Sequence, residues 1–182
     1  MAEIISITGD LGSGKSTVSK ILIEKLNYGY VYTGKIQREI ANRYQMTTLE
    51  LNKFAETHPE IDREIDATFK SLGNSSDLIV DSRMAWFFLP DSFKVCLTTD
   101  VVVAANRIAA DNQRTNEKKY KSIEKTIQDI IARKESENKR YIELYGADCN
   151  DLTNFNMVVD TSYKTPEEVA EKIICGYNSF IV

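Results

Sequence analysis

The sequence predicts an α/β fold in which helices cover both faces of a parallel sheet. Short apolar runs alternate along the chain with longer segments whose apolar residues recur at helical spacing. The short runs are apolar along most of their length, as is typical of parallel strands that are buried on both faces. The first run leads through a glycine-rich loop into a helical segment, and this strand–loop–helix unit agrees with the same class.

The predicted strands are short and apolar, and they span residues 4–7, 30–32, 78–80, 93–97 and 156–160. In an open parallel sheet, ligands bind at the carboxyl ends of the strands. We therefore expect functional side chains directly after the strands, at Thr33-Gly34, Asp81-Ser82-Arg83, Thr98-Thr99 and Asp160-Thr161-Ser162.

Three predicted helices lie between the second and third strands. The first spans residues 36–44. The second begins near Thr47, which has capping-box spacing with Glu50, and the third begins at Pro59, a residue suited to a first helical turn. The stretch 36–73 is therefore predicted to be a small helical insert.

Four further helices are predicted outside the insert. One follows the glycine-rich loop, and another spans residues 101–110. A long, charge-rich helix spans 122–145 after a polar break at 111–116. The last begins at Thr165-Pro166, where proline takes the first helical position and Glu168 completes a capping box.

Length and composition indicate one soluble domain, residues 1–182. No apolar run is long enough to span a membrane, and the N-terminus leads directly into a strand, so we expect no membrane and no signal peptide. Cys96, Cys149 and Cys175 are odd in number and far apart, which favours reduced thiols and a cytoplasmic protein. The net charge of −4 disfavours nucleic acid as a partner. Without an apolar surface stripe, we expect a monomer or a weak oligomer.

The glycine-rich loop fits the phosphate-loop pattern G-x-x-x-x-G-K-[ST], and it stands between a strand and a helix as this motif requires. Glycines let successive N–H groups turn toward a phosphate, and the following helix N-terminus favours anions. Lys15 is the candidate catalytic residue that reaches the β- and γ-phosphates of ATP, and the Ser16 hydroxyl is a candidate Mg²⁺ ligand. The candidate ATP-binding residues of the loop are Gly9, Gly12, Ser13, Gly14, Lys15, Ser16 and Thr17.

Charged residues near the strand ends complete the candidate site. Asp81 ends an apolar strand, where a carboxylate can hold Mg²⁺, although a helix N-cap or turn is the alternative. Arg38 and Arg83 follow two strand ends and suit a bidentate grip on an acceptor phosphate. Arg133 and Arg140 lie seven residues apart and share a helix face, so they are either catalytic or part of a solvated, ion-paired helix.

The residues leave three functions open. A kinase acting on a phosphate needs no strong base, because its acceptor is already ionised, and the single histidine, His58, is absent from every strand end. A kinase acting on a hydroxyl group such as that of a nucleoside would use Asp81 as base. A regulatory protein would bind ATP without transfer. A small GTPase is disfavoured because neither D-x-x-G nor N-K-x-D follows the loop.

The chain resembles the short, archaeal-type cytidylate kinases, which belong to the adenylate-kinase-like P-loop nucleoside monophosphate kinases. The motifs that carry the resemblance are G-x-x-G-S-G-K-S-T at 9–17, Thr33-Gly34 with Arg38, D-S-R-M-A-W at 81–86, R-K-E-S-E-x-x-R-Y at 133–141 and V-D-T-S at 159–162. They cover nearly the whole chain, and the stretch at 133–141 is much more specific than the phosphate loop.

The resemblance implies a P-loop NTPase fold with a five-stranded parallel sheet, a helical insert at 36–73 that binds the monophosphate, and a lid within about 107–145. It implies transfer of a phosphoryl group from ATP to CMP or dCMP with Mg²⁺. Lys15 and the loop would bind ATP, helped by Arg107, while Thr33, Gly34, Arg38 and Arg83 would hold the acceptor. Arg133 and Arg140 would reach in from the lid.

Two positions depart from the family pattern and bear on substrate choice. Lys35 stands where an acidic or small residue is common, and Ser82 where glycine is usual. Asp62, Arg63 and Asp66 in the insert are candidates for base recognition, or else the solvated face of a helix.

Overall fold

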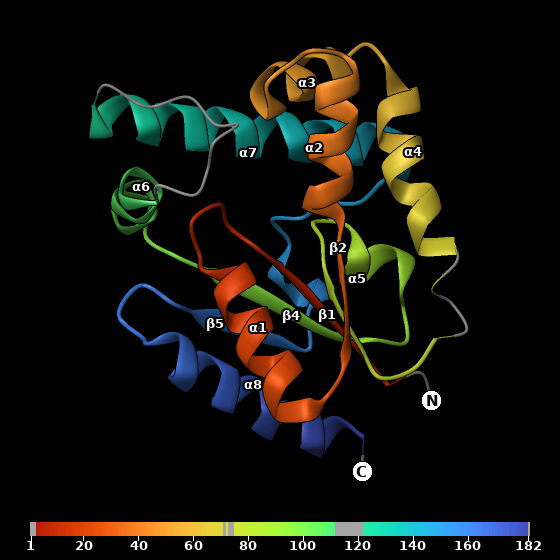
Figure 1. Cartoon of the computed structure of the whole chain (residues 1–182), viewed down its shortest axis with the longest axis vertical. Coiled ribbons are helices and arrows are strands. Elements are labelled where there is room, and N and C mark those ends of the chain that lie inside the picture. The colour runs from red at the N-terminus through yellow and green to blue at the C-terminus, as the bar shows by residue number, and fades with distance from the viewer. Residues whose placement is uncertain (1–2, 71, 73–74, 112–121, 182) are drawn as a thin grey trace.

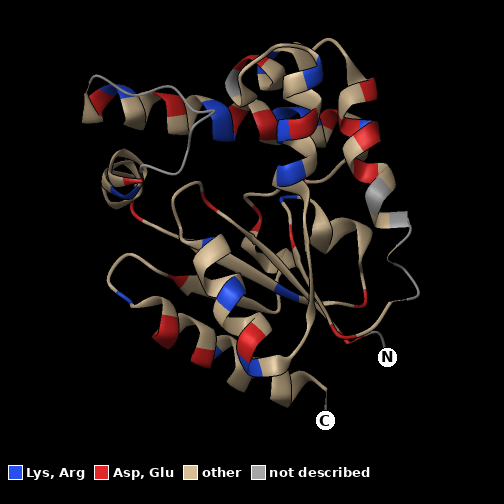
Figure 2. Ribbon diagram, in the orientation of Figure 1, with Lys and Arg blue, Asp and Glu red and all other residues tan. Residues whose placement is uncertain are grey.

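Five parallel strands form the central sheet in the order β2-β3-β1-β4-β5 (Figure 1). This computed structural model describes residues 3–70, 72, 75–111 and 122–181. The strands are β1 (Ile4–Gly9), β2 (Gly29–Tyr32), β3 (Leu78–Asp81), β4 (Phe93–Thr98) and β5 (Met157–Asp160). Charged side chains lie mainly on helices and loops, whereas the strands are mostly apolar (Figure 2). The prediction of a five-stranded, all-parallel α/β fold is confirmed.

The helices occupy the segments between the strands, as the periodicity predicted. They are α1 (Lys15–Leu26), α2 (Thr33–Arg43), α3 (Thr48–Ala55), α4 (Pro59–Lys70), α5 (Ala85–Phe88), α6 (Val101–Ala110), α7 (Ile123–Tyr145) and α8 (Pro166–Phe180). The short helix α5 and a single 3₁₀ turn, η1 (Leu152–Asn154), were not predicted, because segments this short carry no readable apolar periodicity.

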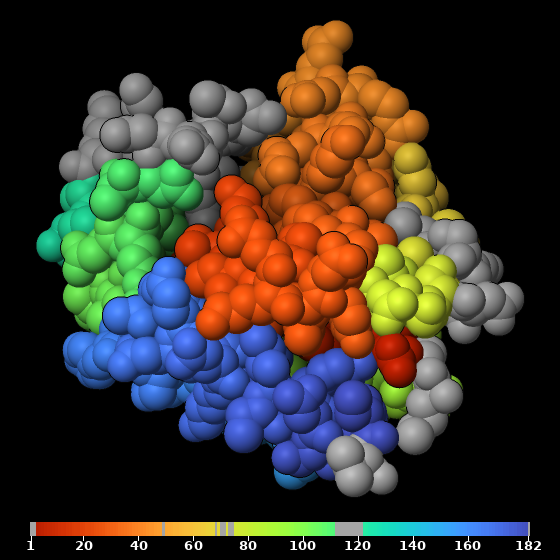
Figure 3. Space-filling model, turned by 60° about the horizontal axis from the view of Figure 1, so that its bottom comes forward, coloured from red at the N-terminus to blue at the C-terminus, as the bar shows by residue number. Residues whose placement is uncertain are grey.

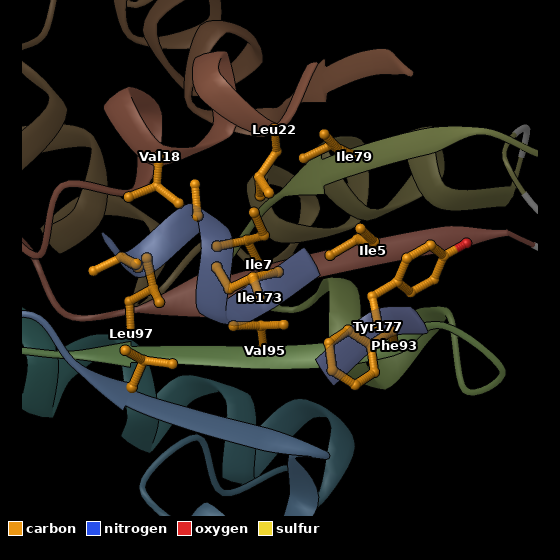
Figure 4. Packing of buried hydrophobic residues seen from close by; sticks show 13 residues of the cluster. Ile5, Ile7, Val18, Leu22, Ile79, Phe93, Val95, Leu97, Ile173 and Tyr177 are labelled. Atoms are coloured by element: carbon orange, nitrogen blue, oxygen red, sulfur yellow. The ribbon is translucent and has the colours of Figure 1, made fainter. Parts of the chain in front are cut away.

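One face of the sheet is covered by α1 and α8, which lie side by side (Figure 3). Alternate residues of the strands point to this face, so Ile5 and Ile7 of β1 pack against Leu22 of α1 and Ile173 of α8 (Figure 4). Tyr177 lies at one end of the cluster, and its hydroxyl is hydrogen-bonded to the Tyr28 hydroxyl at 3.1 Å. This apolar layer holds the phosphate loop at the end of β1.

The opposite face carries the side chains that alternate with those of the first. Val80 of β3 packs with Ala85 of α5 and Phe69 of α4, and Cys96 of β4 packs with Trp86. Helix α7 crosses the carboxyl edge of the sheet (Figure 1), where its side chains contact residues that follow β1 and β3. The long helix α7 therefore covers the edge of the sheet at which the sequence predicts ligand binding.

The insert between β2 and β3 has an apolar core of its own, which includes Ile40, Leu51 and Ile61. The predicted capping box of Thr47 and Glu50 is present at the start of α3. The predicted start of the insert needs correction, because β2 continues without a loop into α2, whose first residue is Thr33. Thr33 and Gly34 thus lie in a helical turn.

The predicted lid at about 107–145 is described only in part. Helix α6 ends at Ala110, and α7 begins at Ile123 with the Ser122 side chain as its N-cap. Residues 112–121, which include Arg114, lie outside the described residues. Within the part of the chain that the structure describes, no helix has the length and apolar character needed to cross a membrane.

The core between α1 and the sheet offers a test of the fold. Replacement Leu22→Ala removes a side chain that is 0% exposed, so it should lower the free energy of unfolding by about 2–5 kcal/mol. Val102→Ala on α6 is the control, since Val102 is 48% exposed and its loss should change stability by about 0.5 kcal/mol or less. Urea denaturation measures both, and equal effects would contradict the packing described.

Candidate active site

The glycine-rich loop turns tightly between β1 and α1, and its glycines at 12 and 14 have positive φ angles. Gly12 has a φ of 80°, and a Cβ there would lie 2.9 Å from atoms of Ala104. Gly14 has a φ of 85°, and a Cβ there would meet no described atom within 4 Å beyond its own neighbours. The first glycine permits close packing against α6, while the second leaves open space in front of the helix N-terminus. Open space and orphan N–H groups together suit an approaching phosphate.

Lys15 is the first residue of α1, and its side chain folds back along the loop. Its Nζ donates hydrogen bonds to the carbonyl oxygens of Gly9 at 2.9 Å and Asp10 at 3.1 Å. Burial lowers the pKa of Lys15 to about 8, although the nearby Asp81 carboxylate opposes this shift. The ammonium group is therefore held at the loop and is poorly hydrated, which strengthens its attraction for an anion.

A pocket of about 430 Å³ opens in front of the loop, and we call it the loop pocket. It is lined by the loop, the end of α6 and the turn before α8: Gly12, Ser13, Gly14, Ser16, Thr17, Val18, Arg107, Ile108, Ala110, Asp111, Thr161, Lys164, Pro166 and Val169. Most of the predicted ATP-binding residues, including Arg107, thus line one space.

Arg107 connects the walls of the loop pocket. Its Nη2 donates to the carbonyl oxygen of Thr161 at 2.8 Å, and its Nη1 donates to the carbonyl oxygen of Gly12 at 3.4 Å. The Thr161 hydroxyl in turn donates to the carbonyl oxygen of Ser13 at 3.0 Å. The sequence pointed to Thr161 as a residue after a strand, but its contact with the loop depends on two segments far apart in the chain.

Asp81 ends β3 beside the loop and is 2% exposed. Burial raises its pKa, and the charge of Lys15, a hydrogen bond from the Tyr30 hydroxyl and the charge of Arg83 counteract that rise. Asp81 and the exposed Ser16 offer oxygen ligands, which Mg²⁺ prefers. Among the described residues, no three His, Cys, Asp or Glu side chains form a metal-binding group. A Mg²⁺ ion here would therefore take most of its ligands from phosphates and water, as is usual for this ion.

A second, smaller pocket of about 40 Å³ lies between the insert, the end of β3 and α7, and we call it the insert pocket. Its walls are Thr33, Gln37, Asp62, Ile65, Asp66, Ser82, Arg83, Met84, Arg133, Glu137 and Tyr141. Three predicted site residues, Thr33, Arg83 and Arg133, are thus brought together from three different elements.

Gly34 and Arg38 lie beside the insert pocket without lining it. The Arg38 guanidinium lies 5.1 Å from the centre of the Tyr32 ring, and its Nη1 donates to the Tyr32 hydroxyl at 3.1 Å. A Cβ at Gly34 would come within 2.4 Å of the same ring. Tyr32 therefore occupies the space between α2 and β2 and determines where Arg38 lies.

Glu137 of α7 is a site residue that the sequence analysis missed, since we grouped it with the solvated charges of the long helix. Its side chain is 4% exposed and forms ion pairs with Arg83 Nε at 2.7 Å and Arg133 Nε at 2.8 Å. Burial alone would raise its pKa, but the charges of the two arginines lower it to about 2. The position of Glu137 four residues after Arg133 is the signal that could have indicated the second pair.

Arg140 lies apart from both pockets, contrary to the expectation that it reaches in from a lid. Its Nε pairs with Asp62 of α4 at 3.1 Å, and two of its nitrogens donate to Asn52 of α3, each at 3.1 Å. The side chain is 5% exposed. The physical reason is that α3 packs against α7 and Asp62 of α4 reaches the same helix face, so a buried arginine there finds its partners in the insert.

The three candidates for base recognition have different surroundings in the structure. Arg63 is exposed, and Asp62 is engaged by Arg140. Asp66 lines the insert pocket and accepts a hydrogen bond from the Tyr145 hydroxyl. Burial raises the pKa of Asp66 to about 6. Asp62 and Asp66 both line this pocket, but Asp62 is paired with Arg140, so Asp66 is the carboxyl group better placed to meet a ligand.

This fold and this site define a P-loop kinase, with a phosphate loop that borders one pocket, and arginines at the carboxyl edge of a parallel sheet that line another. The chain belongs to the cytidylate kinase-like family, whose model matches residues 4–163. The resemblance found in the sequence is confirmed.

Relatives in archaea extend over most of the chain. It is 38% identical over 182 residues to a cytidylate kinase of Sulfurisphaera tokodaii, which covers 98% of this chain and 97% of the relative. It is 39% identical over 158 residues to a cytidylate kinase of Methanothrix thermoacetophila, covering 87% and 88% of the two chains. The similarity that supports the family assignment therefore extends over nearly the whole chain.

Solved structures share the fold at low sequence identity. The shikimate kinase of Bacteroides thetaiotaomicron superposes with a TM-score of 0.65 at 15% identity, covering 94% of this chain and 96% of that one. The shikimate kinase of Acinetobacter baumannii in complex with shikimate gives a TM-score of 0.62 at 19% identity, covering 98% and 94%. These similarities bear on the architecture alone.

The buried pair of Asp62 and Arg140 yields a stability prediction. Asp62→Ala leaves the Arg140 charge buried without its carboxylate partner, so the free energy of unfolding should fall by about 3–5 kcal/mol. Glu143→Ala removes the partner of Lys139 in an exposed pair on the same helix and should cost less than about 1 kcal/mol. If urea denaturation finds the two losses alike, Arg140 is not the buried anchor described.

Proposed function

We propose that the chain transfers the γ-phosphoryl group of ATP to CMP or dCMP, giving ADP and CDP or dCDP. The observation that carries this proposal is the meeting of Arg83 and Arg133 in one pocket beside a phosphate loop. Two guanidinium groups suit an acceptor that carries a phosphate, because each can bind phosphate oxygens through two N–H groups. The archaeal relatives named cytidylate kinase support CMP over a hydroxyl acceptor.

On the donor side, the loop pocket would hold ATP. Backbone N–H groups of the loop and Thr17 would contact the phosphates, and Arg107 would border the nucleotide. Lys15 does not line this pocket and would reach the phosphates from its position along the loop. Ser16 and Asp81 would hold Mg²⁺, directly or through water. When bound, the ion neutralises phosphate charge and orients the triphosphate.

On the acceptor side, Thr33, Gly34 and Arg38 belong to the first turns of α2, and Arg83 follows β3. Arg83 and Arg133 would bind the acceptor phosphate, and Arg133 would also face the charge that develops during transfer. Arg140 would act from outside the pocket, by holding the insert against α7. This assignment gives up the direct catalytic role that we expected for Arg140.

The protein contributes to this reaction by positioning the two substrates and by supplying positive charge. A phosphate monoester is largely ionised at neutral pH, so it attacks without a general base. Lys15 and the arginines lower the repulsion between the anionic donor and acceptor, which is the main barrier to their approach. The helical insert and α7 bound the acceptor pocket, and exclusion of water there would limit loss of the phosphoryl group to hydrolysis.

The remaining expectations concern partners and location. We propose a small-molecule nucleotide as the acceptor, no nucleic acid or membrane partner, a monomer or weak oligomer, and a cytoplasmic location. The net charge of −4 and the acidic residues of α8 (Figure 2) support the absence of a polyanion partner.

A substrate panel tests the proposed reaction. ATP and Mg²⁺ are incubated with CMP, dCMP, UMP, AMP and cytidine, and ADP release is followed in a coupled assay. We expect release with CMP or dCMP and little with cytidine, because a nucleoside offers no phosphate to Arg83 and Arg133. Release with cytidine alone would establish the hydroxyl-acceptor alternative, and ATP binding without release would establish a regulatory protein.

The lowered pKa of Lys15 predicts how ATP binding depends on pH. The protonated ammonium binds phosphate, so affinity should be full below a pH of about 8 and should fall as pH rises through that value. Calorimetric titration with a non-hydrolysable ATP analogue measures this dependence.

Two variants test the assignment to Lys15. Lys15→Ala should bind the analogue weakly at every pH, whereas Lys20→Ala, an exposed lysine of the same helix, should keep the wild-type profile. A wild-type affinity that stays constant through pH 8 would show that Lys15 does not make the expected contact.

A further inference from the structure

Glu137 stands where three parts of the chain meet. It belongs to α7, its carboxylate contacts Arg83 from the sheet edge, and it accepts a hydrogen bond from Asn52 Nδ2 of the insert at 3.0 Å. Arg133, one turn earlier on α7, is the fourth member. All the partners reach a single carboxylate that is almost fully buried.

The two arginines contact different oxygens of Glu137, and the two contacts differ in kind. Arg133 donates a hydrogen bond from Nε, whereas the Arg83 contact is an ion pair without hydrogen-bond geometry. Arg83 presents its Nε to Oε2 at 2.7 Å, and Arg133 presents its Nε to Oε1 at 2.8 Å. Each carboxylate oxygen thus takes one guanidinium group, and both contacts are made at the inner nitrogen of the arginine. The Nε–H hydrogen bond defines the plane and direction of the Arg133 guanidinium, which matters for a fork-shaped donor, and the charge on Oε2 holds Arg83 beside it.

The charges explain why a carboxylate is needed between the arginines. Two guanidinium groups lining a pocket of about 40 Å³ repel one another, and the repulsion is strong where water is scarce. An ionised Glu137 offsets this repulsion and leaves the three side chains with a net charge of about +1. The carboxylate stays ionised at neutral pH, because the two arginines hold its pKa near 2.

We propose that Glu137 is a positioning residue for the acceptor phosphate, which holds Arg83 and Arg133 side by side in the arrangement that binds a nucleoside monophosphate. This inference rests on the proposed function and adds a residue to its acceptor site. Glu137 does not touch the substrate. It acts through the two arginines, and Asn52 extends the same network to the insert.

The charge and positioning effects of Glu137 predict opposite outcomes for Glu137→Gln. The substitution raises the net charge of the three side chains to about +2, so attraction alone would tighten binding of the acceptor anion. An amide, however, carries no negative charge and replaces one carboxylate oxygen by an NH₂ group that only donates, so it cannot present an anionic oxygen to each arginine. If Glu137 positions the arginines, the KM for CMP should therefore rise despite the added positive charge.

The experiment compares Glu137→Gln with Glu135→Gln, a neutralised exposed residue two positions earlier on α7. We expect Glu137→Gln to raise the KM for CMP at least about ten-fold while the KM for ATP stays within about two-fold of wild type. Glu135→Gln should match wild type in both constants. An unchanged or lowered KM for CMP in Glu137→Gln, or a parallel rise for both substrates, would overturn the proposal.

A measurement on the wild-type protein covers the case in which Glu137→Gln fails to fold. NMR of the arginine Nε–H groups, assigned with Arg83→Lys and Arg133→Lys, should show two ordered signals that both shift when CMP is added. Signals that ignore CMP would overturn the proposal. Wild-type protein without CMP-dependent ADP release would refute the proposed function itself, whereas normal release combined with a normal Glu137→Gln variant would refute only the role of Glu137.

Discussion

Repulsion between like charges limits how closely a protein can place the basic groups that phosphate chemistry needs. In this chain four of the basic side chains at the carboxyl edge lie close to carboxylates, whereas Arg38 and Arg107 contact a tyrosine and backbone carbonyl oxygens. Arg83 and Arg133 share Glu137, and Lys134 pairs with Asp10 of the loop at 2.7 Å. Lys15 has Asp81 nearby. The carboxylates keep the cations ordered without cancelling the positive charge of the site.

The same pairs connect the parts of the fold. Helix α7 contacts the phosphate loop through Lys134, the strand end of β3 through Glu137 and the insert through Arg140. A change in the position of α7 would therefore alter contacts with the phosphate loop and the walls of the insert pocket. This arrangement offers a physical route by which the donor and acceptor sites can be organised together. The pairs of Glu137 and Arg140 are largely buried and need a defined geometry, whereas the pair of Lys134 and Asp10 is partly exposed.

The fold shows where an acceptor can bind, whereas the side chains of the pocket determine which acceptor fits. Shikimate kinases share the architecture at 15–19% identity, and their names indicate a different acceptor. The sheet and its helices thus provide a phosphate loop and an edge where an acceptor can lie beside it, as in many P-loop kinases. In this chain the insert pocket is lined by Arg83, Arg133 and Glu137 together with Thr33 and Asp66, and these side chains are where an acceptor would be recognised.

Local patterns of the sequence by themselves determined the strands, most helices, the phosphate loop and the capping boxes. Each depends on residues close together in the chain, such as Thr47 and Glu50 or the glycines before Lys15. The family followed from motifs of the same kind. Tertiary structure alone decided that Glu137 is buried between two arginines and that Arg140 faces the insert, because these pairings join helices and strand ends from distant parts of the chain. A charged residue on a long helix has the same sequence pattern whether water or a carboxylate is its neighbour, and only packing distinguishes the two.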